Sequence, residues 1–182
     1  MWTIPNLFTL LRLILTPFIL LELSRGHYMA GGWMFGGAAF TDVVDGGFAR
    51  RFGAESKFGQ YLDPIADKLL LTSIYIGLAL GGAIPMWVMA TVLGRDVWIL
   101  GLAGIAFLFT SFRDLKPSIW GKASTFAQIM AAVAVMAARA YNYNGFAVIA
   151  GWLIGAVVIL AAVSAADYGW RGISYLRARP GR

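Results

Sequence analysis

Four aspartates lie close together in this chain and have the spacing of a cation site. They are Asp42, Asp45, Asp63 and Asp67, out of nine acidic residues among 182. Asp42 and Asp45 are three residues apart and Asp63 and Asp67 are four apart, so in helices each pair shares one face. Oxygen ligands without neighbouring His or Cys favour Mg²⁺ or Mn²⁺. The spacing therefore predicts a carboxylate site for divalent cations.

A site of this kind suits chemistry at phosphorus. Two cations can stabilise both the attacking and the leaving oxygen of a displacement, and four neighbouring carboxylates need cations to stay ionised together. Gly46 and Gly59 stand beside the aspartates, where the lack of a side chain would let a large polar substrate approach the backbone. We therefore expect a two-metal site that accepts a phosphate-containing substrate.

Other interpretations of the aspartates stay open at this point. They could form interfacial salt bridges with the cations around them, which are Arg50, Arg51, Lys57 and Lys68. The protein could also be a metal-ion or proton transporter, although an ion pathway would have acidic residues spread through the membrane depth. A third possibility is a membrane scaffold without catalytic activity. Ionisable groups inside a membrane usually face a functional cavity, which favours the cation site.

Long apolar helices are the elements that would position these residues. Hydrophobic residues make up 59% and charged residues 13% of the chain, against roughly 25% charged residues in a soluble domain. A span needs roughly 20 residues, and the apolar runs predict six, at about 5–24, 30–52, 60–81, 85–111, 120–140 and 145–170. The predicted fold is an all-α integral membrane protein with six transmembrane helices in one domain, 1–182.

The distribution of positive charge predicts the orientation of the helices. Cations gather after the second, fourth and sixth spans, whereas the opposite side carries Arg25 and Arg139. By the positive-inside rule both termini face the cytoplasm, and the aspartates lie near that side of an inner, cytoplasmic membrane. This topology explains the net charge of +6, so nucleic acid is not an expected partner. Arg12 within the first span indicates a retained helix rather than a signal peptide.

The aspartates belong to a longer pattern that resembles the CDP-alcohol phosphatidyltransferase family. Eight fixed positions of that pattern are present, namely Asp42, Asp45, Gly46, Ala49, Arg50, Gly59, Asp63 and Asp67. Residues 5–12 are similar to the family's N-terminal segment, and residues 62–68 resemble its glycerol-acceptor branch. The resemblance extends over the rest of the chain, because six helices fill its length.

The resemblance implies an activity and a role for each of these residues. Members transfer a phosphatidyl group from a CDP-linked lipid to an alcohol and release CMP. By position, Asp42, Asp45 and Asp63 would be metal ligands, and Asp67 would be the general base and would also contact metal. The site for the CDP-linked lipid would comprise Asp42, Gly46, Ala49, Arg50, Gly59 and Asp63. The implied cofactors are two Mg²⁺ or Mn²⁺ ions, and the family precedent favours a homodimer.

The acceptor site is predicted from cations in the second half of the chain. Arg95 lies inside the fourth span and needs a counter-ion. We expect adjacent Asp96 to point to a different helix face, so that an aspartate across the bundle or an anionic substrate serves Arg95. Lys122 and Arg113 lie near the start of the fifth span. Together with Arg95 they are predicted to bind an acceptor phosphate.

A second resemblance predicts the identity of the acceptor. Residues 115–118, with Lys122, Thr125 and Gln128, are similar to the corresponding part of eukaryotic-type cardiolipin synthases. This favours phosphatidylglycerol as the acceptor and cardiolipin as the product. Glycerol 3-phosphate, which would give phosphatidylglycerophosphate, is the alternative, and both acceptors are glycerol-based.

Overall fold

The part of the chain that the structure describes forms six α-helices. The computed structural model describes residues 4–52, 57–109 and 118–177, and within them the side chains of 9–41, 63–104, 118–172 and 174. The helices are α1 (Ile4–Ser24), α2 (Tyr28–Phe52), α3 (Lys57–Leu80), α4 (Met86–Phe109), α5 (Ile119–Tyr141) and α6 (Asn144–Arg177). The prediction of an all-helical chain with six helices is confirmed.

The helix ends lie within three residues of their predicted positions, except at the end of α6. This helix continues to Arg177, seven residues beyond the predicted end at 170. The prediction ended α6 with its apolar run, but backbone hydrogen bonding does not depend on side-chain polarity.

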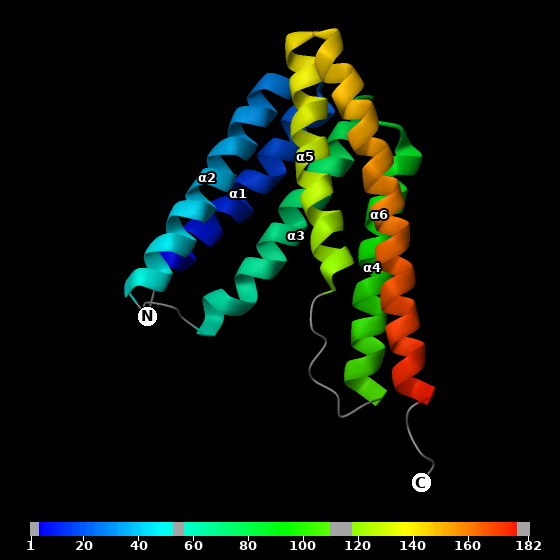
Figure 1. Cartoon of the computed structure of the whole chain (residues 1–182). Helices are drawn as coiled ribbons and strands as arrows, with labels where there is room; N and C mark the ends of the chain where they lie inside the picture. The colour runs from blue at the N-terminus through cyan, green and yellow to red at the C-terminus, as the bar shows by residue number, and fades with distance from the viewer. Residues whose placement is uncertain (1–3, 53–56, 110–117, 178–182) are drawn as a thin grey trace.

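Successive helices run in opposite directions, so that α1 begins and α6 ends at the same end of the bundle (Figure 1). The starts of α3 and α5 lie at that end too. α1 packs against α2 and α3, and α6 packs against α5 and α4, while contacts of α2 with α5 and of α3 with α4 and α5 join the two groups. The first half of α3, which carries Asp63 and Asp67, therefore lies toward the same end as the start of α5.

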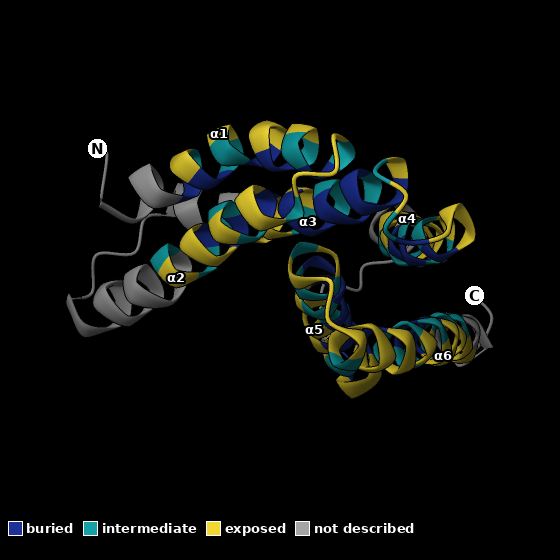
Figure 2. Cartoon of the chain, turned by 90° about the horizontal axis from the view of Figure 1, so that it is seen from above, coloured by how far each residue is buried: buried dark blue, intermediate teal, exposed yellow. Residues whose placement is uncertain are grey.

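Apolar side chains fill the interfaces between helices. One buried cluster contains Ile19 and Leu23 of α1, Ile74 and Leu78 of α3, and Val157 of α6. Figure 2 shows buried residues along the helix faces that turn toward neighbouring helices, with exposed residues on the outer faces. In a bilayer such packing stabilises the bundle through dispersion contacts, because lipid and protein interior are equally apolar.

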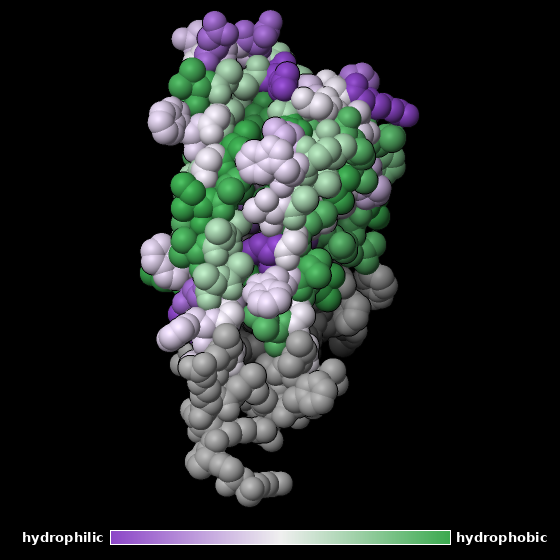
Figure 3. All heavy atoms as spheres, turned by 90° about the vertical axis from the view of Figure 1, so that its right-hand side faces the viewer, coloured by the Kyte–Doolittle hydropathy of each residue, from purple (hydrophilic) through white to green (hydrophobic). Residues whose placement is uncertain are grey.

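The outer surface of the bundle suits a bilayer. Three helical segments of the described chain are long and apolar enough to cross a membrane, namely Met86–Gly104, Ile119–Tyr141 and Asn144–Gly172. Hydrophobic residues, mixed with residues of intermediate hydropathy, make up much of the coloured part of the face seen in Figure 3, and large apolar side chains such as Trp152, Ile159 and Trp170 are exposed. Apolar area of this extent is typical of a surface that contacts lipid. That α1, α2 and α3 also cross the membrane stays a prediction.

Two glycines bring α3 and α1 into close contact. A Cβ built on Gly77 would lie 2.8 Å from Cβ of Leu23, and one built on Gly81, just after α3, would lie 2.2 Å from the backbone oxygen of Leu23. Tyr28 also donates a hydrogen bond from its hydroxyl to the Gly81 carbonyl. Small residues spaced four apart allow this approach of two helix backbones, and the α1–α3 interface that holds the aspartates depends on it.

Gly81→Ala is therefore expected to destabilise the protein. The added methyl group would displace the backbone of Leu23, and overpacking of this kind costs about 1–3 kcal/mol. Thermal unfolding of the purified protein in one detergent measures the effect. Gly36→Ala in α2 is the matched control, because a Cβ there meets nothing within 4 Å, and alanine is favoured over glycine in a helix by about 1 kcal/mol. Equal melting temperatures for both variants would contradict the close contact.

Candidate active site

Asp63 and Asp67 lie on one face of α3, where that helix packs against α1. The Thr9 hydroxyl donates a hydrogen bond to Oδ1 of Asp63, and Arg12 forms an ion pair with Oδ1 of Asp67. Thr9 and Arg12 are buried, at 2% and 3% exposure, whereas the Asp67 side chain is 57% exposed. Buried Arg12 therefore holds the carboxylate of Asp67, while more than half of the Asp67 side chain remains accessible to a ligand.

The other predicted site residues in the first half of the chain lie on α2 and at the start of α3. Asp42, Asp45, Gly46, Ala49 and Arg50 belong to α2, and Gly59 belongs to α3. Their side chains lie outside the described residues, so that their meeting with Asp63 and Asp67 stays a prediction. The helical backbone does support the shared face, because positions 42, 45, 46 and 49 have the three- and four-residue spacing of one helix side.

The described carboxylates fit a hard divalent cation in their chemistry. Asp63 and Asp67 offer oxygen donors on successive turns of α3, and such donors suit Mg²⁺ or Mn²⁺. Within the side chains that the structure describes, no group of three or more His, Cys, Asp or Glu residues is arranged to hold a metal ion. A complete ligand set would therefore need Asp42 and Asp45 from α2.

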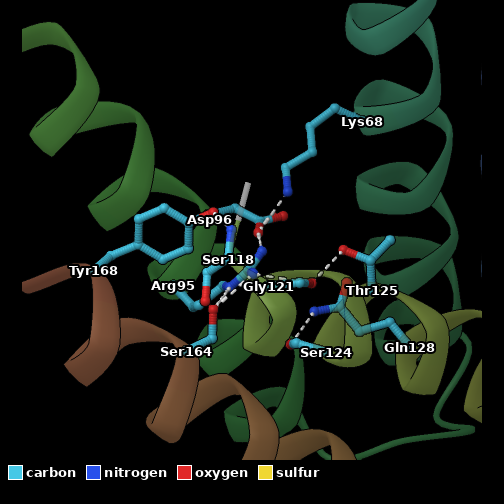
Figure 4. A network of polar contacts seen from close by, with 10 residues as sticks. All are labelled: Lys68, Arg95, Asp96, Ser118, Gly121, Ser124, Thr125, Gln128, Ser164 and Tyr168. Atoms are coloured by element: carbon cyan, nitrogen blue, oxygen red, sulfur yellow. Dashed lines mark hydrogen bonds and ion pairs between the residues drawn. The ribbon is translucent and has the colours of Figure 1, made fainter. Parts of the chain in front are cut away.

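A second polar cluster joins α3 to α4, α5 and α6 (Figure 4). Nζ of Lys68 lies 2.6 Å from Oδ1 of Asp96, and NH1 of Arg95 lies 2.8 Å from the same oxygen. NH2 of Arg95 donates to Oγ of Ser164 at 2.8 Å and to the carbonyl of Gly121 at 3.4 Å. This charged network, formed by Lys68, Asp96, Arg95 and Ser164, fixes the helix with the aspartates against the other half of the bundle.

The expectation that Asp96 points away from Arg95 is wrong. Residues next to each other on a helix start in different directions, but the long guanidinium side chain bends back to Asp96, whose carboxylate is also drawn toward Lys68. The counter-ion of Arg95 is thus its own neighbour rather than an aspartate across the bundle. The contact of Arg95 with an acceptor phosphate stays a prediction. The guanidinium of Arg95 already has partners within the protein.

The start of α5 is held by side chains of α6. Ser118 caps the helix by accepting a hydrogen bond from the amide of Trp120, and its own hydroxyl donates to Asp167. Arg171 pairs with Asp167 at 3.1 Å. Lys122 is exposed one turn into α5, which leaves it accessible to a ligand, and Arg113 lies outside the described residues. The acceptor roles of Lys122 and Arg113 stay predictions.

Four residues that the sequence analysis did not place in the site contact it or support it, namely Thr9, Arg12, Lys68 and Asp96. The signal for Arg12 was present, because a buried cation in an apolar helix requires a counter-ion, and Asp67 supplies one. Lys68 pairs with Asp96, an acid outside the cluster, rather than forming the interfacial salt bridge with a neighbouring aspartate that was the alternative interpretation. Thr9 lies in residues 5–12, which resemble the family's N-terminal segment, but nothing in the sequence indicated its contact with Asp63.

Six helices, of which three contain segments apolar enough to cross a membrane, and two carboxylates held at a helix interface fit the class of α-helical membrane enzymes. The sequence model of the family described as "CDP-alcohol phosphatidyltransferase" matches residues 2–165 of the chain. The chain therefore belongs to the CDP-alcohol phosphatidyltransferase family, which confirms the resemblance found in the sequence. Enzymes of this family generally use divalent metal ions.

Curated relatives cover most of the chain. It is 36% identical to a probable phosphatidylglycerophosphate synthase of Mycobacterium tuberculosis, over 91% of this chain and 79% of that protein. It is 33% identical to a probable cardiolipin synthase (CMP-forming) of Drosophila melanogaster, over 89% of this chain but 56% of that protein. A CDP-diacylglycerol–glycerol-3-phosphate 3-phosphatidyltransferase of Aquifex aeolicus is 29% identical over 95% of this chain and 97% of that protein. The chain thus spans little more than half of the fruit-fly relative.

Proposed function

We propose that this protein transfers the phosphatidyl group of CDP-diacylglycerol to a glycerol-based acceptor and releases CMP. The observation that carries the proposal is the pair Asp63 and Asp67 on one face of α3, held from α1 by Thr9 and Arg12, in a member of this family. The relatives named above act on glycerol-based acceptors by their names. The resemblance of residues 115–128 favours phosphatidylglycerol, with glycerol 3-phosphate as the alternative.

The residues of this chain would bind the cations, the CDP-linked lipid and the acceptor. Asp42, Asp45 and Asp63 would hold the cations, which Asp67 would also contact. Gly46, Ala49, Arg50 and Gly59 would let the cytidine and pyrophosphate lie close to α2 and α3. Two Mg²⁺ or Mn²⁺ ions, when bound, would neutralise charge on the pyrophosphate. Arg95, Lys122 and Arg113 would bind the acceptor.

The reaction would be a single displacement. The acceptor oxygen bonds to the phosphorus of the phosphatidyl group as the bond from that phosphorus to the oxygen of CMP breaks. Asp67 takes the proton of the acceptor hydroxyl, and its exposure would let that hydroxyl come within hydrogen-bond reach, as a general base requires. No covalent enzyme intermediate is needed, in agreement with a chain that contains no cysteine.

The membrane arrangement is part of this proposal. All six helices would cross an inner, cytoplasmic membrane as one domain, with both termini and the site on the cytoplasmic side. The end where α1, α3 and α5 begin would then face the cytoplasm. A homodimer would be the assembled form.

Release of CMP by purified protein tests the activity. We expect release with CDP-diacylglycerol and either phosphatidylglycerol or glycerol 3-phosphate, and none with inositol phosphate or serine. Treatment with EDTA should reduce release to the level of the blank, and Mg²⁺ or Mn²⁺ should restore it. Folded protein that stays silent with every acceptor and both metals would overturn the proposal, as would release that is unaffected by EDTA.

A further inference from the structure

Among its described residues, α1 carries three polar side chains that are almost completely buried. Thr9, Arg12 and Thr16 are 2%, 3% and 7% exposed. Thr9 and Arg12 reach across the helix interface to Asp63 and Asp67. The Thr16 hydroxyl instead donates to the carbonyl of Arg12 in its own helix, at 2.8 Å. Two of the three side chains thus contact the carboxylates of α3.

We propose that Thr9 and Arg12 are positioning residues of the cation site, and that α1 is a working part of it. Thr9 would orient the Asp63 carboxylate, and Arg12 would hold Asp67 beside it. The inference rests on the proposed function, since it takes these carboxylates as cation ligands. Carboxylates that bind metal are themselves held by hydrogen bonds from neighbouring groups, and loss of such a partner typically weakens metal binding or activity by about 10-fold to 100-fold.

The geometry of two parallel helices matches this role. Thr9 and Arg12 are three residues apart, and their partners Asp63 and Asp67 are four apart. At a rise of about 1.5 Å per residue, Thr9 and Arg12 are about 4.5 Å apart along the axis of α1, and Asp63 and Asp67 are about 6 Å apart along the axis of α3. Both contacts can therefore form together at one place in the α1–α3 interface, where Gly77 and Gly81 farther along bring the backbones close.

The chemistry of each side chain fits its partner. A threonine hydroxyl donates one hydrogen bond, and an ionised carboxylate has about four acceptor positions, so that Asp63 keeps oxygen lone pairs for a cation. Arg12 brings a fixed positive charge to the Asp67 carboxylate, and a charge-assisted contact of this kind is strong and directional. An apolar residue at either position would remove this contact with the carboxylate.

The affinity for Mn²⁺ tests the role of Thr9 without any substrate. Free Mn²⁺ is measured by electron paramagnetic resonance in titrations of the purified full chain in detergent. Thr9→Val is expected to weaken binding by about 10-fold, and Thr9→Ser, which keeps the hydroxyl, should restore it. Thr16→Val is the matched control, because it removes a buried hydroxyl from the same helix that contacts no carboxylate; its affinity should equal that of the wild type. Asp63→Asn shows that the titrated site is this one.

Steady-state kinetics of CMP release test Arg12. Arg12→Lys keeps the positive charge but has a different reach and geometry. If Arg12 places Asp67 for reaction, kcat should fall about 10-fold, with little change in KM for CDP-diacylglycerol. A change in KM alone, or a melting temperature lowered with unchanged kcat, would overturn the positioning role of Arg12.

The outcomes separate this inference from the proposed function. Mn²⁺ binding that is equal in the wild type and in Thr9→Val overturns the role of Thr9, even when CMP release is intact. A wild type that binds no Mn²⁺ also overturns it. A wild type whose Mn²⁺ binding is weakened by Thr9→Val, but which releases no CMP with any acceptor, overturns the proposed reaction and supports the cation site.

Discussion

Asp67→Asn is expected to lower the rate of CMP release by about 10²–10⁴-fold, the contribution that a positioned general base usually makes. Asparagine has nearly the same shape, and its carbonyl oxygen can still accept a hydrogen bond from Arg12, the ion-pair partner of Asp67. The loss should therefore concern mainly proton transfer and cation binding, and the cost to folding should be smaller than at Asp96, because the Asp67 side chain is 57% exposed. The rate is measured with CDP-diacylglycerol, saturating Mg²⁺ and the preferred acceptor.

Glu22→Gln is the matched control for this variant. It removes one carboxylate charge from the other end of α1, where Glu22 lies 2.8 Å from His27, and it should keep the wild-type rate. Both variants should elute as the wild type does in size-exclusion chromatography. A rate for Asp67→Asn within threefold of the control would exclude Asp67 as the base.

Of the substitutions considered for this protein, Asp96→Asn is expected to lower the free energy of unfolding the most. The carboxylate of Asp96 lies within 2.8 Å of both Lys68 and Arg95, and Arg95 and Asp96 are each 7% exposed. Without this negative charge, the positive charges of Lys68 and Arg95 would lie close together with no anion between them, and Arg95 would remain buried. Breaking a buried ion pair by removing one partner costs about 3–5 kcal/mol. Thermal unfolding in a single detergent, read against the wild type, measures the loss.

Two further variants show whether charge is the cause. Lys68→Met leaves the pair of Arg95 and Asp96 intact, and the Lys68 side chain is 36% exposed, so that its loss should cost about 1 kcal/mol or less. Arg95→Met added to Asp96→Asn removes the unpaired buried cation and should recover part of the stability. A double variant that is less stable than Asp96→Asn alone would contradict this explanation and point to packing instead.

Much of the fold was predictable, because it depends on local properties of the chain. A run of about 20 apolar residues forms a helix wherever it occurs in a membrane, and glycines and prolines such as Gly82 and Pro85 mark where helices stop. The end of α6 was missed for the same reason, since Arg177 belongs to the helix but not to the apolar run. The aspartate pattern identified the family, because the resemblance depends on those residue types at those spacings.

The partners of the charged residues were not predictable in the same way. Sequence spacing places Asp63 and Asp67 on one face of a helix, but it does not say that α1 lies against that face. Arg12 required a counter-ion, and many acids were available to it. Asp96 was expected to point away from Arg95, but the two side chains form an ion pair. The conformation of a side chain depends on the charges of all the helices around it, which the sequence does not give.

The sequence by itself determined the six helices, the family and the carboxylate pairs, since each follows from residues close together in the chain. Only the tertiary structure decided that Thr9 and Arg12 of α1 hold the carboxylates of α3, and that Lys68, Asp96 and Arg95 join α3 to α4. These contacts link residues up to 55 positions apart. They depend on which helix faces meet, and that is settled by the packing of the whole bundle, including the close approach at Gly77 and Gly81.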